Sequence, residues 1–227
     1  METAISVIIP AYNEARRLPP HLAEVREYLS RVYPDCHEVI VVDDGSSDDL
    51  AGVVEPLRAD WPELSLLRHP TNQGKGVAVR TGMMAAGGDT LLFTDADGAT
   101  PIDQEAKLTE AIRDGADVAI GSRLLPGAGV VRRRTLLRGL AGRLFASVAR
   151  WWLKVPVRDT QCGFKMFRCE VGRKLFSQSH ESGYLFDLEL LAMAAQLGCR
   201  VVEVPINWAD VPGGHLSLSR QMGGALV

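Results

Sequence analysis

Short apolar runs alternate with longer segments of helical periodicity along about the first 120 residues. The predicted strands are residues 5–9, 38–42, 64–67, 90–94 and 116–120. The predicted helices are residues 14–33, a segment capped by Ser46 or Ser47 and ending near residue 60, and residues 74–86 and 101–114. Alternation at this spacing predicts an α/β fold, a doubly wound and mostly parallel sheet with helices on both faces.

The second half of the chain is patterned differently. Residues 126–129 form a glycine- and proline-containing connection, residues 134–153 have an amphipathic helical pattern, and residues 164–167 resemble a strand. A helix is predicted over residues 185–197 and a strand over residues 200–204, and the glycine-rich stretch from residue 211 is expected to be mobile. With no internal repeat and no clear boundary, residues 1–227 are predicted to form a single domain.

Polar side chains follow four of the predicted strands at the point where each strand ends. They are Tyr12, Asn13 and Glu14 after the first, Asp43 and Asp44 after the second, Asp95 and Asp97 after the fourth, and Arg123 after the fifth. In parallel sheets, ligands bind beyond the carboxyl ends of the strands, so these side chains are expected to share one site. The alternative is that the acids only cap the helices that follow.

Asp95 and Asp97 are the candidate metal ligands. If strand geometry persists through Asp97, both carboxylates point to the same side, with Ala96 between them and Gly98 allowing a sharp turn. A compact set of oxygen ligands suits Mg²⁺ or Mn²⁺ carrying a substrate diphosphate. The other interpretation is a turn whose aspartates cap a helix starting near Pro101.

Two further segments near the predicted edge are ambiguous. Gly74-Lys75-Gly76 lacks the spacing of a Walker loop, yet it can bring backbone N–H groups and one ammonium near a diphosphate, or be a plain turn. Asp43 and Asp44 can accept hydrogen bonds from a nucleotide base or ribose, or cap the next helix.

Composition and charge narrow the function classes. The chain has 227 residues, 46% of them hydrophobic, and a formal net charge of −3, so no nucleic-acid partner is expected. No apolar run approaches the roughly 20 residues that span a bilayer. Four cysteines without metal or disulfide spacing favour reduced thiols in the cytoplasm.

The charge is distributed unevenly. Residues 118–158 contain no Asp or Glu but many basic residues, namely Arg123, Arg132, Arg133, Arg134, Arg138, Arg143, Arg150, Lys154 and Arg158. Together with Trp151-Trp152, the helix within this segment matches one that lies on anionic lipid, or else a solvated basic face backed by core tryptophans. His215, in the glycine-rich tail, is a weaker candidate metal ligand or a surface residue.

Two acidic residues in the second half carry open alternatives. Asp159, in the polar tract 158–165, is either paired with Arg158 at the surface or a catalytic carboxylate beside the metal site. Asp187, near the start of the helix predicted over residues 185–197, either complements the helix dipole or contacts substrate.

These motifs together resemble a known family. Pro10-Ala11-Tyr12-Asn13-Glu14, Val41-Val42-Asp43-Asp44-Gly45-Ser46, Asp95-Ala96-Asp97-Gly98 and Gly121-Ser122-Arg123 resemble the family 2 inverting glycosyltransferases of GT-A fold. The tract Arg158-Asp159-Thr160-Gln161-Cys162-Gly163-Phe164-Lys165, with Phe186-Asp187-Leu188-Glu189-Leu190 and Asn207-Trp208, is similar to the dolichyl-phosphate and polyprenyl-phosphate β-glucosyltransferase branch.

The resemblance implies roles for particular residues. Asp95 and Asp97 would hold Mg²⁺ or Mn²⁺, and Asp159, Asp97 and Arg123 would act at the reacting centre. The nucleotide sugar would be bound by Pro10, Tyr12, Glu14, Asp43, Asp44, Lys75, Asp95, Ala96 and Asp97. Arg123, Arg134 and Arg138 would bind the acceptor phosphate, and Gln161 and Asp187 would lie near the sugar. Residues 1–123 would then be the nucleotide-sugar-binding half and residues 124–227 the acceptor-binding half.

The activity implied is transfer of a hexose, glucose from UDP-glucose first, to a polyprenyl or dolichyl phosphate with inversion to the β-linked product. The enzyme would act at the cytoplasmic membrane face, attached peripherally through the basic helix or C-terminal sequence. A phosphate monoester is largely dianionic at neutral pH, its second pKa being about 6, so it needs no strong general base. Alternatives are mannosyl or N-acetylglucosaminyl transfer, a hydroxyl acceptor with Asp159 or Asp187 as base, a nucleotidyltransferase, and a non-catalytic nucleotide-sugar binder.

Overall fold

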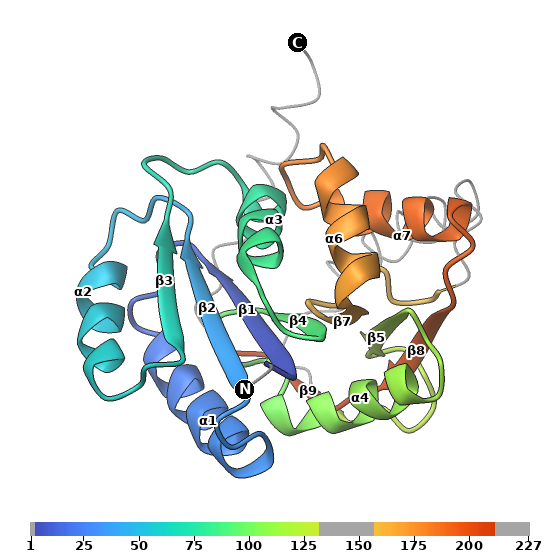
Figure 1. Ribbon diagram of the computed structural model, residues 1–227, viewed down its shortest axis with the longest axis horizontal. Coiled ribbons are helices and arrows are strands. Elements are labelled where there is room, and N and C mark those ends of the chain that lie inside the picture. Colours follow the sequence, from blue (N-terminus) through green and yellow to red (C-terminus); the bar gives the residue numbers. More distant parts are fainter. Residues whose placement is uncertain (1–2, 132–156, 212–227) are drawn as a thin grey trace.

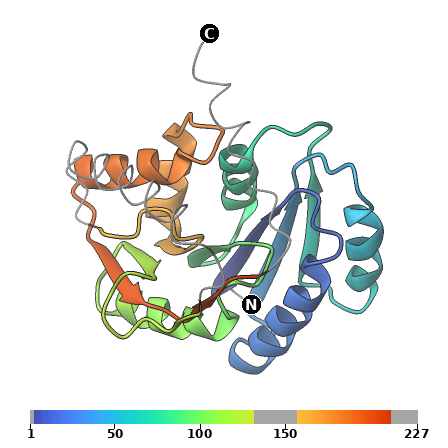
Figure 2. The same cartoon turned by 180° about the vertical axis from the view of Figure 1, so that it is seen from behind.

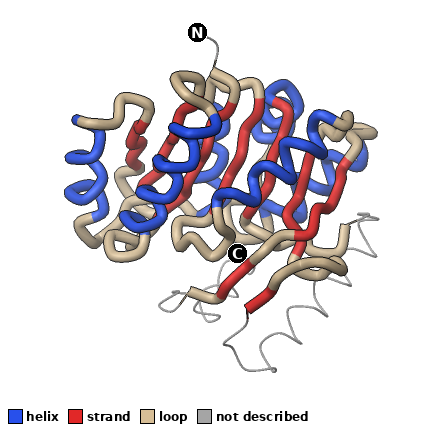
Figure 3. The backbone as a smooth tube through the Cα atoms, turned by 90° about the horizontal axis from the view of Figure 1, so that it is seen from below, coloured by secondary structure: helices blue, strands red, loops and turns tan. Residues whose placement is uncertain are grey.

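The computed structural model describes residues 3–131 and 157–211. Its centre is a seven-stranded sheet in the order β3-β2-β1-β4-β7-β5-β8. The strands are β1 (Ile5–Ala11), β2 (His37–Asp43), β3 (Leu64–Arg68), β4 (Thr90–Thr94), β5 (Val118–Ser122), β7 (Phe164–Arg168) and β8 (Val201–Pro205). Two short strands, β6 (Val130–Val131) and β9 (Trp208–Ala209), pair in parallel as a second sheet. Figure 3 shows the main sheet as a single layer with helices on both of its faces.

The helices divide between the two faces of the sheet. α3 (Lys75–Ala85), α6 (Cys169–Gln178) and α7 (Phe186–Gln196) lie on one face, and α1 (Leu18–Val32) and α4 (Glu105–Arg113) lie on the other (Figure 1). α2 (Leu50–Val54) lies beside the edge strand β3 and runs into the 3₁₀ turn η1 (Glu55–Ala59), and η2 (Ile102–Gln104) precedes α4. With both faces covered, all seven residues of β1 are buried, as parallel sheets require.

Strand β7 changes the topology from the simple parallel sheet predicted over the first half. β3, β2, β1 and β4 are neighbours and parallel, but β7 enters antiparallel between β4 and β5. β5 pairs in parallel with β8 instead of lying next to β4. Strands from both halves of the chain therefore form one sheet, which Figure 2 shows from behind. The sheet is mostly parallel, as predicted.

Some predicted boundaries were wrong. The helix expected from residue 14 begins at Leu18, which puts two prolines in the first turn, where their missing N–H groups cost nothing. The helix expected after Ser46 or Ser47 begins only at Leu50, and Pro56 divides it into α2 and η1. Helix α6 was not predicted at all. The expected helix over residues 134–153 and the expected mobile tail after residue 211 lie outside the described residues.

Candidate functional site

The carboxyl ends of β1, β2, β4 and β5 share one edge of the sheet because these strands are parallel. The antiparallel strand β7 begins at the same edge, so the tract 158–165 arrives beside Asp95. The Asp95 backbone N–H donates to the Gly163 carbonyl at 3.1 Å. A Cβ atom on residue 163 would lie 2.0 Å from Asp95 Oδ2, so any larger residue there would displace the Asp95 carboxylate. Two distant motifs of the sequence are thereby joined.

Asp95 is paired with Lys75. Lys75, the first residue of α3, places its Nζ 2.6 Å from Asp95 Oδ1 and 5.9 Å from the centre of the Phe93 ring. Burial alone would lower the pKa of Lys75, but the carboxylates of Asp95 and Asp187 raise it above its ordinary value. Lys75 is therefore a fixed positive charge next to the first aspartate of the candidate metal site.

Asp97 lies on the turn after β4. Its Oδ1 accepts the Ala99 backbone N–H at 3.1 Å, and its Oδ2 lies 3.6 Å from Arg17 Nη1. Burial, followed by the charge of Asp95, raises the pKa of Asp97 above its ordinary value. Asp97 thus makes a short turn through one oxygen, but no described side chain caps η2 or α4, so the alternative that the aspartates cap the helix near Pro101 was wrong.

The donor set suits a divalent cation. Within the described residues, neither Asp95 Oδ2 nor Asp97 Oδ2 accepts a hydrogen bond, and the two carboxylates are close enough for one to raise the pKa of the other. A cation bound between them would relieve that repulsion, and oxygen ligands are those that Mg²⁺ and Mn²⁺ prefer. No cluster of three or more His, Cys, Asp or Glu side chains with metal-binding geometry occurs among residues 3–131 and 157–211. A cation held by these two aspartates would need further ligands, which substrate and water could supply.

Arg123 and Asp159 form a second charged pair. Arg123 donates to Asp159 from its backbone N–H at 2.9 Å, from Nε at 2.8 Å and from Nη2 at 2.8 Å. Asp159 is 4% exposed, and Glu203 accepts its backbone N–H at 2.8 Å. Burial would raise the pKa of Asp159, but the hydrogen bonds and charge of Arg123 outweigh it and hold the pKa below its usual value. The suggested surface pair with the exposed Arg158 was wrong.

Asp187 also forms a buried ion pair, with Lys165. It is 4% exposed, and Lys165 Nζ, itself on a side chain that is 1% exposed, lies 2.6 Å from Asp187 Oδ1. Lys165 also donates to the Cys162 carbonyl and lies 5.2 Å from the centre of the Phe93 ring. Asp187 thus lies beneath the site in an ion pair that joins β7 to α7.

Asp43 and Asp44 form hydrogen bonds and an ion pair with neighbouring residues of the fold. Asp43 Oδ1 accepts the Ser46 backbone N–H at 2.8 Å, and its Oδ2 lies 3.0 Å from Arg68 Nε. Asp44 accepts hydrogen bonds from the loop that leads to α3, from His69 Nδ1 at 2.7 Å, Asn72 Nδ2 at 2.9 Å, the Gln73 N–H at 2.9 Å and the Gly74 N–H at 2.8 Å. Neither aspartate caps α2, contrary to one of the two alternatives for this pair.

The remaining predicted residues are distributed around this edge. Tyr12 is 37% exposed, Pro10 is buried within β1, and Ala96 is 5% exposed. Glu14 accepts hydrogen bonds from Arg17 on both oxygens. Gln161 lies in the loop before β7, with Nε2 buried and without a partner among the described residues. Arg134, Arg138, His215 and the Trp151-Trp152 pair lie outside the described residues.

Two residues at this edge, Arg17 and His21, were missed in the sequence, and a third, Trp208, was noted only within a family motif and given no role. Arg17 holds Glu14 and approaches Asp97. His21, 2% exposed, packs against Gly98, and burial lowers its pKa to about 4. The Trp208 ring lies 5.6 Å from the Arg123 guanidinium carbon. Arg17 follows Glu14 by three residues, a spacing that indicates a local pair, whereas nothing local in the sequence links His21 to the site. The motif Asn207-Trp208 pointed to Trp208, but only its position in the fold shows its contact with Arg123.

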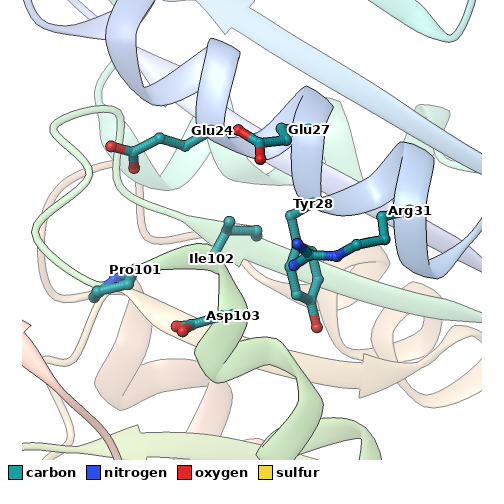
Figure 4. Close-up of a pocket in the computed structure, with 7 residues that line it drawn as sticks. All are labelled: Glu24, Glu27, Tyr28, Arg31, Pro101, Ile102 and Asp103. Atoms are coloured by element: carbon teal, nitrogen blue, oxygen red, sulfur yellow. The ribbon is translucent and has the colours of Figure 1, made fainter.

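A pocket lies elsewhere, between α1 and the segment that includes η2. Figure 4 shows Glu24, Glu27, Tyr28 and Arg31 on α1 opposite Pro101, Ile102 and Asp103. None of the predicted site residues lines it. Beneath it, the hydroxyl group of Tyr28 donates to Glu105 at 2.8 Å, which ties α1 to α4.

Comparisons with known proteins agree with these motifs. The family model described as Glycosyl transferase family 2 matches residues 6–176. Dolichyl-phosphate beta-glucosyltransferase ALG5C of Trichomonas vaginalis is 35% identical over 96% of this chain and 67% of its own length. The dolichyl-phosphate beta-glucosyltransferase of Drosophila melanogaster is 37% identical over 94% of this chain and 69% of its own length. The human protein of that name is 34% identical over 93% of this chain and 69% of its own length.

Solved structures support the fold. Glucosyl-3-phosphoglycerate synthase from Mycobacterium tuberculosis, in complex with Mn²⁺, UDP and phosphoglyceric acid, superimposes with a TM-score of 0.67 at 22% identity, covering 96% of this chain and 73% of that one. The mannosyltransferase PcManGT from Pyrobaculum calidifontis, with GDP-Man and Mn²⁺, gives a TM-score of 0.63 at 22% identity, over 95% and 59% of the two chains. These similarities confirm the predicted GT-A fold.

Proposed function

The chain belongs to glycosyl transferase family 2 and is a glycosyltransferase, and from this premise we propose that it transfers glucose from UDP-glucose to a polyprenyl phosphate of the dolichyl type. The product would be the β-linked lipid-phosphate glucose, formed by inversion of an α-linked donor. The observation that carries the proposal is 32–37% identity, over most of the chain, to relatives named dolichyl-phosphate beta-glucosyltransferase. Residues 1–123 would bind the donor and residues 124–227 the acceptor.

The charged groups at the carboxyl edge suit this donor. Asp95 and Asp97 would hold Mg²⁺ or Mn²⁺, which when bound stabilises the negative charge of the departing diphosphate. Lys75, 2.6 Å from Asp95, would add a positive charge near the same diphosphate. Tyr12, which is 37% exposed, offers a ring and a hydroxyl group for the nucleoside at the end of β1. The wall of the donor site would be formed by the remaining predicted residues, which are held in place by the backbone and ion pairs described above. They are Pro10, Glu14, Asp43, Asp44 and Ala96.

The ion pairs formed by Asp159 and Asp187 favour a phosphate acceptor over a hydroxyl acceptor. A hydroxyl nucleophile needs a general base, and the candidates were Asp159 and Asp187. Both oxygens of Asp159 accept from Arg123, and Asp187 is buried against Lys165. A phosphate monoester is already an anion at neutral pH and needs positioning rather than deprotonation. Arg123 would orient it, with Arg134 and Arg138 contributing from the basic segment and Gln161 lying near the sugar.

The acceptor proposed is a lipid, so the enzyme would work at a membrane surface. None of the helices within residues 3–131 and 157–211 is long and apolar enough to cross a bilayer. We propose peripheral contact at the cytoplasmic face through the predicted basic helix of residues 134–153, whose arginines would attract anionic lipid headgroups.

Donor and acceptor are tested together in one assay. The purified chain is incubated with one radiolabelled donor, UDP-glucose, UDP-N-acetylglucosamine or GDP-mannose. Each donor is offered a short polyprenyl phosphate or, in a parallel reaction, the matching polyprenol. Every reaction is run once with Mn²⁺ and once with EDTA. The expected result is transfer from UDP-glucose to the phosphate only, abolished by EDTA. Transfer to the polyprenol would contradict the acceptor, preference for another donor would contradict the sugar, and full activity in EDTA would contradict the metal site.

A further inference from the structure

We infer that Trp208 is a positioning residue for Arg123: its ring holds the arginine so that one edge of the guanidinium faces the acceptor phosphate. This inference rests on the proposed function, because it takes Arg123 as the group that binds the phosphate. Trp208 itself is not placed in contact with the reacting atoms. Its effect would pass entirely through the orientation of the arginine.

The contacts of the guanidinium define what remains free. Nε and Nη2 each donate to a different oxygen of Asp159 at 2.8 Å, so one edge of the planar group is fully used. Within the described residues, Nη1 makes no hydrogen bond. The carboxylates of Asp159 and Asp95 both help to raise the pKa of Arg123 despite its burial, so the guanidinium lies within the field of the candidate metal site. The edge carrying Nη1 is the one left for a ligand.

Two hydrogen bonds along one edge allow the guanidinium to tilt about that edge. The Trp208 ring limits the tilt, because its centre lies 5.6 Å from the guanidinium carbon and the ring face attracts the cation. Asp159 therefore fixes the position of the guanidinium within its plane, and Trp208 fixes the plane itself. A phosphate bound by paired hydrogen bonds needs both, since bidentate geometry is strict.

The backbone of Trp208 is held on two sides. The Trp208 N–H donates to the Gly129 carbonyl at 2.8 Å, and Val130 is its partner in the β6–β9 pairing. The next residue, Ala209, donates its N–H to the Ala99 carbonyl at 2.8 Å. Ala99 is also the residue whose N–H binds Asp97 Oδ1. Strand β9 thus links the turn of the candidate metal site to the ring that orients the arginine.

Three variants test the role of the ring. Trp208→Leu is expected to raise the KM for a short polyprenyl phosphate about 3–10-fold, as loss of one cation–π contact predicts, with the KM for UDP-glucose changed less than about 2-fold. Trp208→Phe keeps an aromatic face and is expected to restore most of the loss. In an Arg123→Ala background, Trp208→Leu should add nothing further, because the group it orients is gone.

Trp61 supplies the matched control. Arg26 lies 5.6 Å from the Trp61 ring, the same separation, but Trp61 precedes β3 and so lies at the opposite edge of the sheet. Trp61→Leu is expected to lower the Tm while leaving both KM values within about 2-fold of the parent. Equal rises in acceptor KM for the two leucine variants would show a general loss of structure and overturn the inference.

A physical readout separates this inference from the proposed function. In the ¹⁵N–¹H spectrum, the Nε–H signal of Arg123, assigned by its loss in Arg123→Ala, should broaden or shift in Trp208→Leu and return toward its position in Trp208→Phe. An unchanged signal and unchanged acceptor KM in Trp208→Leu would overturn the positioning role, provided that Arg123→Ala raises that KM. If Arg123→Ala leaves the acceptor KM unchanged, the proposed acceptor site itself is wrong, and the inference falls with it.

Discussion

The chain contains two aspartate pairs that resemble each other in sequence, and the structure uses them in opposite ways. Asp43-Asp44-Gly45 and Asp95-Ala96-Asp97-Gly98 each follow an apolar strand and each end in a glycine. The side chain of Asp44 is 4% exposed and accepts four hydrogen bonds from the loop before α3. Asp95 and Asp97 have side chains 41% and 27% exposed, and each keeps one oxygen without a hydrogen bond among the described residues.

The difference shows that a carboxylate can be fully hydrogen-bonded or partly open, depending on the groups that surround it. Asp44 faces two backbone N–H groups and two side-chain donors of one loop, so it fixes the shape of that loop. The loop leads through Gly74 to Lys75, and Lys75 contacts Asp95. The first pair thus supports the second.

The largest effect is expected from Asp97→Asn. If Asp97 binds the proposed metal, removing its charge should lower kcat by about 100–1000-fold, equivalent to about 2.7–4 kcal/mol, because the cation would lose a charged ligand. The fold should be unaffected, because the amide oxygen still accepts the Ala99 N–H. Steady-state kinetics with UDP-glucose and a polyprenyl phosphate, alongside circular dichroism, measures both. Retention of normal turnover would exclude Asp97 from the site.

Asp44→Ala is expected to act chiefly on stability. It leaves the donors of His69, Asn72 and two backbone N–H groups without their acceptor, and loss of the buried carboxylate should cost about 2–3 kcal/mol in the free energy of unfolding. Urea denaturation measures that change. The fall in kcat should be much smaller than for Asp97→Asn, and the reverse order would mean that the roles of the two pairs are exchanged.

A smaller effect is expected from the two basic side chains that contact these aspartate pairs. Lys75 contacts Asp95 at 2.6 Å, and Arg68 contacts Asp43 at 3.0 Å. In the presence of Mn²⁺, Lys75→Met should weaken UDP binding about 10-fold, about 1.4 kcal/mol, because a charge near the diphosphate is removed. Arg68→Met should change it less than about 2-fold. Isothermal titration calorimetry compares them, and equal effects would argue against a diphosphate contact by Lys75.

The smallest effect concerns pH. Burial and Asp95 raise the pKa of Asp97, so the folded state holds that proton more tightly than the unfolded chain does. Stability from this group is therefore present below the ordinary pKa of 3.8 and is lost as pH rises through the raised value. Without metal, Asp97→Asn should thus raise the Tm at pH 7, by at most about 3 °C, and the gain should vanish in acid. Scanning calorimetry at both pH values tests this, and a lower Tm at neutral pH would contradict it.

Much of this architecture was predictable because it is local. Runs such as residues 90–94 are continuous apolar segments ending in turn residues, and β4 spans the same residues, Thr90–Thr94. Because parallel strands end at one edge, the convergence of Asp95, Asp97 and Arg123 followed from order alone. The family resemblance, carried by short motifs, is confirmed by the match over residues 6–176.

Other features escaped sequence reasoning because they depend on packing between distant residues. Helix α6 went unrecognised because Gly172 interrupts its pattern, although that glycine allows close packing on Phe167 and Leu91. The start of α2 was misplaced because the Ser46 and Ser47 hydroxyl groups bind Asn13, 33 and 34 residues away, instead of capping the helix. The roles of Arg134, Arg138 and His215 lie outside the described residues and stay predictions.

By itself, the sequence determined the alternation of strands and helices, the edge of the sheet at which the polar side chains gather and the family to which the chain belongs, since each follows from side-chain periodicity and short motifs. Only the tertiary structure decided which charges pair. Asp159 meets Arg123 across 36 residues, and Trp208 reaches the same arginine, because β7 enters the sheet antiparallel and β9 docks beside the turn after Asp97. Partner choice is a property of packed surfaces, and no local pattern encodes it.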